Sequence, residues 1–374
     1  MKTRLVQPGS VIGILGGGQL GRMMALSARE MGYKIAVLEP LDNSPCGQVA
    51  DIEVIASYDD VEGAKKLAQA CDVLTYEFEN IDSDTAKWLD EHMYLPQGYE
   101  LLQTAQHRIK EKQAIEQLNV KVAPYRAIKR YADLTQALDE LGIPAVLKTC
   151  RGGYDGKGQY VIRSREDVQE AFDTLEQAGE LVLEQWIPFQ KELSVIVSRN
   201  SSGEVKTFPV AENIHRNNIL HQTIVPARVS EEIENRARQI AIQLAEGFEM
   251  VGTLAVEMFF TENEDLYVNE LAPRPHNSGH FTMNACETSQ FEQHIRAVCN
   301  LPLGETSLLK PVVMVNILGE HLPKVIEKLP QLGSMKLHLY GKDEAKTGRK
   351  MGHINVLAPT VEEALGKIEA LEIW

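Results

Sequence analysis

A glycine-rich stretch at residues 150–162, CRGGYDGKGQYVI, combines closely spaced glycines with basic, acidic and aromatic side chains. It does not fit the phosphate-binding P-loop, because Gly158 follows Lys157 where that motif needs Ser or Thr. Arg151 also stands where the motif has its first glycine. The residues that follow, Gln159-Tyr160-Val161-Ile162, resemble a strand rather than a helix. The pattern predicts a glycine-rich loop between two strands that approaches a phosphate closely.

Two carboxylates interrupt apolar runs in the stretch TLAVEMFFTENEDLYVNELAPRP. A polar turn at residues 262–265 would pair Glu257 with Glu270, and Asn269 adjoins the second carboxylate. Carboxylate and amide oxygens are hard ligands that suit Mg²⁺ together with substrate phosphates. An internal ion pair with Arg274 or Lys148 would explain the same residues. Buried carboxylates need a positive partner in either case, so both readings stay open.

A second glycine cluster, GGGQLG at residues 16–21, lies between an apolar run and a helical pattern. It satisfies G-x-G-x-x-G, and Glu39 ends the next apolar run, as in dinucleotide-binding domains. A nicotinamide-dependent oxidoreductase is therefore one alternative. Glycines at a helix start also form a general phosphate site, or simply a tight turn between strand and helix.

Composition limits the class of protein. The 374 residues are 44% hydrophobic with a net charge of −15, which argues against nucleic acid or an anionic membrane as main partner. No apolar stretch approaches the ~20 residues of a membrane helix. The five cysteines lack metal or disulfide spacing and predict free thiols in a reducing cytoplasm.

The hydrophobic pattern changes along the chain. Strands at 11–15, 34–38 and 72–76 alternate with helices at 19–31, 59–70 and 83–92, which predicts a parallel sheet. One long polar helix at 101–118 is expected as a connector. Strands at 145–149, 159–162 and 181–184 with a helix at 165–177 predict a small α+β unit. Longer, mostly antiparallel strands follow from about residue 186, and a last small unit is expected after Pro311.

Together these pieces resemble the ATP-grasp superfamily. Within it, GGGQLGRMM, YEFEN, CRGGYDGKGQ, PVAENIHRNNIL, NELAPRPHNSGHFT and GRKMGHINV are similar to the motifs of the 5-(carboxyamino)imidazole ribonucleotide synthases of purine biosynthesis. The resemblance spans residues 11–359. It implies a mixed α/β and α+β architecture: a Rossmann-like pre-ATP-grasp domain at 1–105, a mobile lid domain with its connector helix at 106–185, and a large α+β domain with a C-terminal subdomain at 186–374.

The resemblance implies an ATP-dependent carboxylating ligase. Bicarbonate would attack the γ-phosphorus of ATP, and the carboxyphosphate formed would carboxylate the exocyclic amine of 5-aminoimidazole ribonucleotide. ATP and Mg²⁺ are the implied cofactors, with a homodimer as the implied assembly. A formate-dependent transformylase or a biotin carboxylase-like enzyme is the alternative within the superfamily.

The same resemblance assigns roles to residues of this chain. It implies that Glu257 and Glu270 bind magnesium, and that Arg274 and His276 hold bicarbonate or carboxyphosphate. A zinc site at His276 and His280 is disfavoured by the surrounding oxygen ligands. For ATP it implies Arg108, Lys148, Gly153, Tyr154, Asp155, Gly156, Lys157, Gly158, Gln159, Glu184, Gln185, Trp186, Ile187, Glu192, His215, Asn269 and Glu270. For the ribonucleotide it implies Gln19, Leu20, Glu77, Tyr154, Asp155, Lys342, Arg349 and Lys350.

Overall fold

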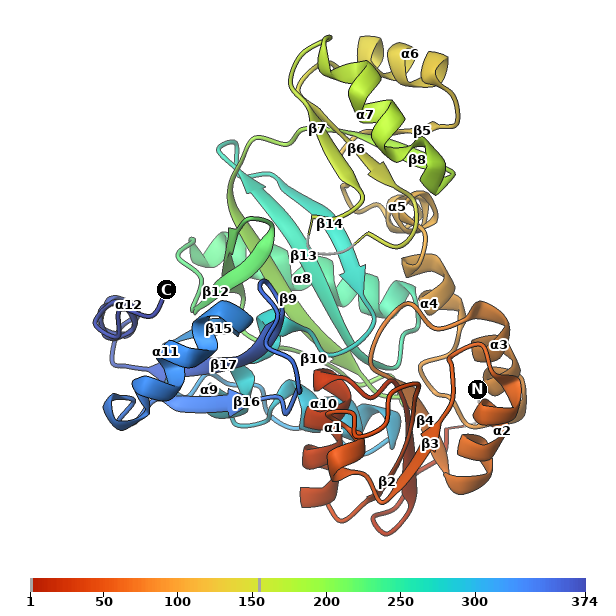
Figure 1. The fold of residues 1–374 in the computed structure, drawn as a ribbon, viewed down its shortest axis with the longest axis vertical. Coiled ribbons are helices and arrows are strands. Elements are labelled where there is room, and N and C mark those ends of the chain that lie inside the picture. The colour runs from red at the N-terminus through yellow and green to blue at the C-terminus, as the bar shows by residue number, and fades with distance from the viewer. Residues whose placement is uncertain (1–2, 154–155) are drawn as a thin grey trace.

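The structure is a computed structural model that describes residues 3–153 and 156–374 (Figure 1). The described residues form two four-stranded sheets and one nine-stranded sheet. The predicted contacts of Tyr154 and Asp155 lie outside the described residues. None of the described helices has the length and apolar character that crossing a membrane requires.

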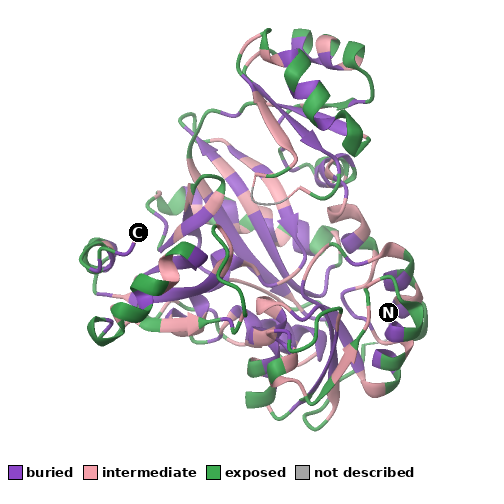
Figure 2. Ribbon diagram, viewed as in Figure 1, coloured by how far each residue is buried: buried purple, intermediate pink, exposed green. Residues whose placement is uncertain are grey.

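The N-terminal sheet is parallel, as the sequence predicts, with strand order β3-β2-β1-β4. Its strands are β1 (Val11–Leu15), β2 (Lys34–Glu39), β3 (Ile52–Ile55) and β4 (Val73–Tyr76). The helices of this part are α1 (Gln19–Glu30), α2 (Val61–Ala70) and α3 (Ser83–His92). The central strands are almost wholly buried because helices cover both faces, which explains their continuous apolar runs (Figure 2).

The predicted single connector helix at 101–118 is wrong. The segment forms α4 (Glu100–Ala105) and α5 (Arg108–Gln117), separated at Gln106 and His107. His107 is extended, with φ −140° and ψ 105°. The Gln106 side chain donates to the carbonyl oxygens of Glu79 and Ile81 in the N-terminal domain, at 2.6 and 2.8 Å. Tertiary hydrogen bonds therefore break a segment whose local propensity favours one helix.

The second four-stranded sheet, with order β5-β8-β6-β7, stands apart from the rest of the molecule at the top of Figure 1. It contains β5 (Tyr125–Ile128), β6 (Ala145–Thr149), β7 (Gln159–Ile162) and β8 (Leu181–Gln185). Helices α6 (Tyr131–Leu141) and α7 (Asp167–Leu175) pack on it and close a separate hydrophobic core. We refer to this unit, residues 125–185, as the lid.

The nine-stranded sheet is antiparallel and has the order β14-β13-β9-β11-β12-β15-β17-β16, with β10 paired to β9. Its strands are β9 (Phe189–Arg199), β10 (Val205–Thr207), β11 (Ala211–Arg216), β12 (Ile219–Val225), β13 (Gly252–Thr261), β14 (Leu266–Ala272), β15 (Val312–Leu318), β16 (Lys336–Leu339) and β17 (Lys350–Leu357). The accompanying helices are α8 (Glu231–Gly247), α9 (Thr282–Ala285), α10 (Gln290–Val298), α11 (Leu322–Glu327) and α12 (Val361–Glu369).

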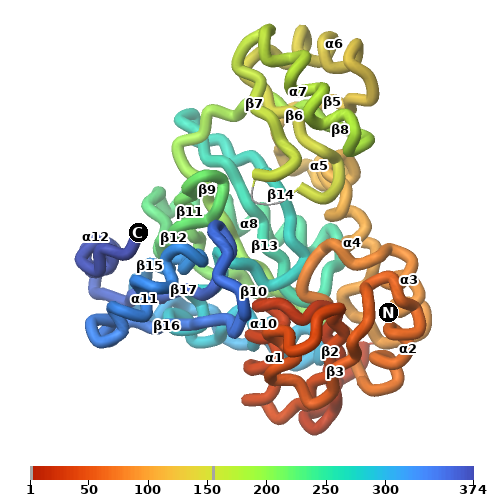
Figure 3. The backbone as a smooth tube through the Cα atoms, in the orientation of Figure 1, coloured from red at the N-terminus to blue at the C-terminus, as the bar shows by residue number. Residues whose placement is uncertain are grey.

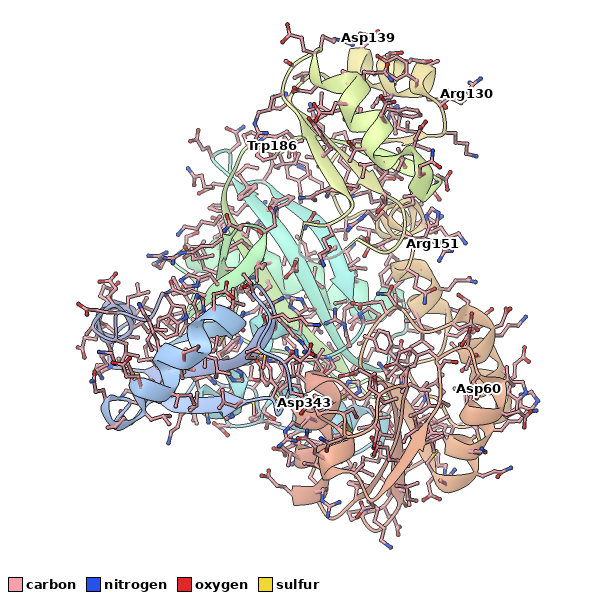
Figure 4. All side chains as sticks on the ribbon, in the orientation of Figure 1. Asp60, Arg130, Asp139, Arg151, Trp186 and Asp343 are labelled. Atoms are coloured by element: carbon pink, nitrogen blue, oxygen red, sulfur yellow. The ribbon has the colours of Figure 1, made fainter. Side chains whose placement is uncertain are left out.

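The residues after Pro311 form a small unit with its own hydrophobic core, as expected, but its strands also join the large sheet. Strand β15 pairs with β12 from Gln222↔Val315 to Val225↔Val312, so the C-terminal strands extend the large sheet. The other end of this region meets the N-terminal domain: Asp343, labelled in Figure 4, lies where the C-terminal strands approach α1. The segment after β16 therefore brings Lys342 to the first glycine loop, where it contacts Gln19.

Candidate active site

The acidic hairpin has the predicted pairing. Glu257 on β13 lies opposite Glu270 on β14, and the register shifts immediately afterwards so that Met258 pairs with Val268. Asn269 is the extra residue of this bulge. Burial, together with the charge of Glu270, raises the pKa of Glu257 to about 8. The two carboxylates therefore repel each other in a site short of positive charge.

The donor set of this hairpin fits a magnesium ion. The side-chain oxygen of Asn269 is buried and has no hydrogen-bond partner within the described structure. It adjoins two carboxylates, and burial together with the charge of Glu270 raises the pKa of Glu257. A hard divalent cation would satisfy the amide oxygen and remove the repulsion. Glu257, Asn269 and Glu270 are the residues that would hold it.

Arg108 connects this hairpin to the glycine-rich loop. One terminal nitrogen lies 3.6 Å from a Glu270 carboxylate oxygen, and the other donates to the Gly153 carbonyl at 3.5 Å. Glu111, one turn along α5, accepts a 2.8 Å hydrogen bond from the backbone of Leu271. Burial and the charge of Glu270 raise the pKa of Glu111 to about 8. Sequence reasoning missed Glu111, whose position in a charged helix gave no signal.

Lys148 and Glu184 form a buried charge network with Lys112, a residue that sequence reasoning also missed. The Lys112 ammonium lies 3.2 Å from one Glu184 oxygen, and the Lys148 ammonium lies 2.9 Å from the other. Burial alone would raise the pKa of Glu184, but the two lysines outweigh it and lower that pKa to about 2. Burial lowers the pKa of Lys148. The three side chains tie α5 to strands β6 and β8 of the lid.

Residues 150–153 and 156–158, between β6 and β7, extend from the lid toward β14 (Figure 3). The backbone N–H of Thr149 donates to the Gly158 carbonyl at 2.8 Å, which closes the base of the loop. Gly156 has φ +78°, and a Cβ there would lie 2.5 Å from the side chain of Asn218. Asn218 belongs to the turn between β11 and β12. The glycine-rich loop thus reaches from the lid across to the large sheet.

The residues expected near adenine and ribose lie where the lid joins the large sheet. The Gln185 backbone donates to Pro124 at 2.8 Å, and Trp186 is 38% exposed at this junction (Figure 4). Ile187 is buried. Glu192 on β9 lies 3.1 Å from Nδ1 of His215 on β11. Burial lowers the pKa of His215, but the bond to Glu192 and that carboxylate's charge raise it overall.

Arg274 and His276 follow β14 and adjoin the hairpin. Arg274 pairs with Glu79 of the YEFEN motif at 2.5 Å, which links the large sheet to the N-terminal domain. Nδ1 of His276 lies 2.9 Å from the Ser278 hydroxyl and 3.6 Å from a Glu257 oxygen. Burial, followed by the charges of Arg274 and Lys350, holds the pKa of His276 well below its usual range. The imidazole is therefore neutral at physiological pH.

The first glycine loop is occupied by the protein's own carboxylates. Glu77 accepts hydrogen bonds from the backbone N–H groups of Gly18 and Gly21, and Glu39 accepts one from Gly17 at 2.7 Å. A Cβ at Gly16 would lie 2.4 Å from Glu77, so the close approach requires glycine there. A dinucleotide pyrophosphate would need these N–H groups. The nicotinamide alternative therefore finds no support in this loop.

The basic residues of the C-terminal segment reach the start of α1. The Lys342 ammonium donates to the side-chain oxygen of Gln19 at 2.6 Å and to the Lys350 carbonyl at 2.7 Å. Arg349 donates to the Glu344 carbonyl at 3.0 Å. Gln19 and Leu20 begin α1, where backbone N–H groups have no partner within the helix. The first residue of α1 and Lys342 are thus in contact, although they are far apart in the sequence.

Comparison with known proteins gives matches along the chain. Three families match successive parts: the ribonucleotide synthetase preATP-grasp domain over residues 10–106, the ATP-grasp domain over 113–291, and the phosphoribosylaminoimidazole carboxylase C-terminal domain over 312–367. N5-carboxyaminoimidazole ribonucleotide synthase from Bacillus subtilis (strain 168) is 57% identical over 369 residues, which cover 98% of this chain and 97% of the relative.

Solved structures agree with these sequence matches. An ADP complex of N5-carboxyaminoimidazole ribonucleotide synthetase superposes with a TM-score of 0.97 at 62% identity, covering 100% of this chain and 98% of the other. An Aspergillus clavatus N5-carboxyaminoimidazole synthase in complex with ADP and 5-aminoimidazole ribonucleotide has a TM-score of 0.92 at 33% identity, covering 97% of each chain.

The fold and the site define an ATP-grasp ligase, an enzyme that uses ATP to activate a carboxylate-type substrate. More narrowly, the chain belongs to the N5-carboxyaminoimidazole ribonucleotide synthase family. Enzymes of this family carboxylate the amine of 5-aminoimidazole ribonucleotide at the expense of ATP in purine biosynthesis. The resemblance inferred from the motifs is confirmed, and the oxidoreductase alternative is not supported.

The charge network around Glu184 predicts a pH-dependent stability. Glu184→Gln leaves Lys112 and Lys148 without their anion, so it should lower the free energy of unfolding at pH 7 by about 3–5 kcal/mol. The stabilisation by Glu184 is fully present above its unfolded pKa and is lost as pH falls toward its folded pKa of about 2. Urea unfolding at pH 7 and between pH 4.5 and 3 measures both effects.

Glu91→Gln is the matched control, because Glu91 is an exposed helical carboxylate 4.0 Å from Lys87. Its change in unfolding free energy should stay within about 0.5 kcal/mol at every pH. Equal losses of unfolding free energy in Glu184→Gln and Glu91→Gln would contradict the proposed contribution of the buried network to stability.

The contact of Gly156 with Asn218 predicts a specific effect on ATP. Gly156→Ala should raise the KM for ATP on the order of tenfold, because the methyl group strains the backbone and displaces the loop from Asn218. Gly179→Ala introduces the same type of backbone strain, at φ +89°, but the new methyl group has open space around it. The KM of this variant for ATP should therefore equal that of the wild type. Steady-state kinetics compare the two. Combining Gly156→Ala with Asn218→Gly, which removes the Asn218 Cβ that the new methyl group would meet, should partly restore the KM for ATP, and no restoration would speak against the contact.

Proposed function

We propose that this chain carboxylates 5-aminoimidazole ribonucleotide with bicarbonate and ATP, at a site between the lid and the large sheet. The observation that carries the proposal is the position of Arg108, which joins the glycine-rich loop at Gly153 to the acidic hairpin at Glu270. A triphosphate placed there would meet cations from α5 and β6 on one side and magnesium ligands on the other. Relatives solved with ADP or ATP support the assignment of the nucleotide.

The proposed ATP residues fall into three groups, which contact the phosphates, the adenine and the ribose. Arg108, Lys148 and the loop residues Gly153, Gly156, Lys157, Gly158 and Gln159 hold the phosphates, where positive charge and backbone N–H groups offset the charge that develops during phosphoryl transfer. Glu184, Gln185, Trp186 and Ile187 line the adenine pocket at the junction of lid and large sheet. Glu192, held by His215 at 3.1 Å, accepts hydrogen bonds from the ribose hydroxyls.

Magnesium would be held by Glu257 and Glu270 with the Asn269 amide oxygen beside them. When bound there, it would offset negative charge on the phosphates and orient them. The protein's own contribution is the buried hairpin, which keeps both carboxylates at one point of the sheet through the Glu257↔Glu270 pairing.

Arg274 and His276 bind bicarbonate in this proposal. A bicarbonate oxygen attacks the γ-phosphorus, the bond to the ADP oxygen breaks, and carboxyphosphate forms. The guanidinium of Arg274 holds the anion, and Glu79 fixes its direction. His276 is neutral because of burial, so one ring nitrogen can accept a proton while the other is held by Ser278.

The ribonucleotide occupies the N-terminal side. Its amine attacks the carbon of carboxyphosphate, or CO₂ derived from it, phosphate leaves, and the amine gives up a proton. The 5′-phosphate lies at the start of α1, between Gln19, Leu20, Lys342, Arg349 and Lys350. Glu77 accepts a hydrogen bond from the aminoimidazole. The Aspergillus clavatus relative solved with ADP and 5-aminoimidazole ribonucleotide supports binding of this substrate.

The domain boundaries, the assembly and the location are further parts of this proposal. We assign domains at 1–105, 106–185 and 186–374, a homodimer, and a cytoplasmic location. The location is supported by five cysteines that form no disulfide. The small-molecule partners are the ribonucleotide and bicarbonate, with no nucleic acid or membrane partner.

The decisive test is ADP release with ATP, magnesium and bicarbonate, measured with and without 5-aminoimidazole ribonucleotide. Release should be strongly stimulated by the ribonucleotide, and Glu270→Ala should abolish it because the hairpin loses a ligand and Arg108 loses its partner. Glu264→Ala, in the turn of the same hairpin, is the control and should keep activity. ATP turnover stimulated instead by formate and glycinamide ribonucleotide would replace this function with the transformylase alternative.

The convergence of Lys342 and Gln19 predicts a defect limited to the ribonucleotide. Lys342→Ala should raise the KM for 5-aminoimidazole ribonucleotide roughly ten- to a hundredfold, the loss expected of one charged hydrogen bond to phosphate. The KM for ATP should change less than about twofold, because the cation lies away from the acidic hairpin. Lys346→Ala, an exposed lysine of the same segment paired with Glu344, is the control. An equal rise in both KM values would argue against a phosphate role.

A further inference from the structure

A cluster of three potential metal ligands lies beside the active site and takes no part in the proposed reaction. His107, Cys150 and Glu180 come from three separate segments: the break between α4 and α5, the end of β6, and the residue before β8. Their donor atoms all lie within 4.8 Å of one another. Among residues 3–153 and 156–374 it is the one group of three such side chains with this spacing.

Two backbone hydrogen bonds hold these segments together. The N–H of Arg108 donates to the Cys150 carbonyl at 3.0 Å, and the N–H of Cys150 donates to the Glu180 carbonyl at 3.0 Å. The three side chains are therefore brought together by main-chain contacts and not only by their own attraction. A site fixed in this way loses little conformational freedom when it binds a ligand.

Burial and partners indicate what the cluster would bind. His107 is 9% exposed and Cys150 is 2% exposed. One ring nitrogen of His107 lies 3.1 Å from a Glu180 oxygen, and the other is buried and has no hydrogen-bond partner among the described residues. The Glu180 side chain is 34% exposed, which leaves one side of the cluster open to solvent. Lys129 is the nearest competing cation, 3.7 Å from the second Glu180 oxygen.

The chemistry of the three donors selects the type of metal. Sulfur, imidazole nitrogen and one carboxylate oxygen together suit zinc and cobalt, whereas magnesium avoids thiolate ligands. Tetrahedral zinc ligands lie roughly 3.5 Å apart, so the cluster would need to contract by only about 1 Å. Side-chain rotation of Glu180 and Cys150 can supply that change.

We propose that His107, Cys150 and Glu180 form a binding site for one zinc-class divalent ion that regulates the enzyme. A neutral imidazole nitrogen, a carboxylate oxygen and the Cys150 sulfur bind the ion, and water completes four-coordination. The thiol releases its proton to solvent when the metal–sulfur bond forms. Binding itself does not depend on the proposed function.

The effect on turnover does rest on the proposed function. His107 directly precedes Arg108, and Cys150 directly precedes the glycine-rich loop whose Gly153 accepts from Arg108. A metal bridge between these two segments restrains both phosphate-binding elements at their bases. We expect slower ATP turnover, because the bridge restrains Arg108 and Gly153, which the proposed function places at the ATP phosphates.

The test is a titration of the full-length protein with Co²⁺, without nucleotide and magnesium. One equivalent should bind with the intense near-ultraviolet absorption of a thiolate–cobalt bond, and one equivalent of Zn²⁺ should remove that band. Cys150→Ser should abolish the band. Cys71→Ser is the control, because Cys71 is a more exposed cysteine outside the cluster whose sulfur contacts the Ala68 carbonyl. A band that persists in Cys150→Ser, or no band in the wild type, overturns the proposal.

Glu180→Gln provides a second variant if Cys150→Ser fails to fold. The glutamine keeps an oxygen facing His107 at a half-exposed position, so folding should be preserved while cobalt affinity falls at least about tenfold. Micromolar Zn²⁺ should inhibit wild-type ADP release in excess magnesium and spare Glu180→Gln. Equal inhibition of both overturns the regulatory role. Absence of ATP turnover in zinc-free protein supplied with magnesium, bicarbonate and 5-aminoimidazole ribonucleotide would instead count against the proposed function, with the cobalt titration unaffected.

Discussion

The arrangement of the lid depends on a buried carboxylate and two buried lysines where the lid meets helix α5. Glu184 is 3% exposed and lies between Lys112 and Lys148, so its carboxylate is stabilised only while α5, β6 and β8 stay together. A buried carboxylate without partners would be costly. Because Arg108 and Lys112 are four residues apart on one helix face, fixing Lys112 also fixes Arg108. This network thereby positions Arg108, whose guanidinium reaches both Glu270 and the glycine-rich loop.

The acidic hairpin has the opposite balance. Glu257, Glu270 and nearby Glu111 gather negative charge that the surrounding cations only partly offset, and the pKa values of Glu257 and Glu111 rise to about 8. Such a site gains free energy when a divalent cation enters. One part of the junction thus pairs its carboxylate with cations of the protein, while the adjacent part is electrostatically incomplete. This contrast is what a site for a metal-bound nucleotide requires.

The two glycine clusters show how far a motif defines a site. GGGQLG has the dinucleotide pattern, yet Glu39 and Glu77 occupy its backbone N–H groups. The glycines at 152–158 match no common pattern, yet Gly156 approaches Asn218 on another sheet. Glycine spacing predicts where a backbone can be approached closely. Which group makes that approach depends on residues brought there from elsewhere in the chain.

The sequence by itself determined the parallel N-terminal sheet, the antiparallel pairing of Glu257 with Glu270, and the family, because these depend on local periodicity, one short turn and long motifs. Only the tertiary structure decided the helix break at His107, the joining of the C-terminal strands to the large sheet, and the contacts of Lys112 and Glu111. Each of these depends on hydrogen bonds or charge pairs between distant segments, such as Lys342 with Gln19. Local propensity contains no information on such partners, so a charged residue in a polar helix looks the same whether it faces solvent or a buried carboxylate.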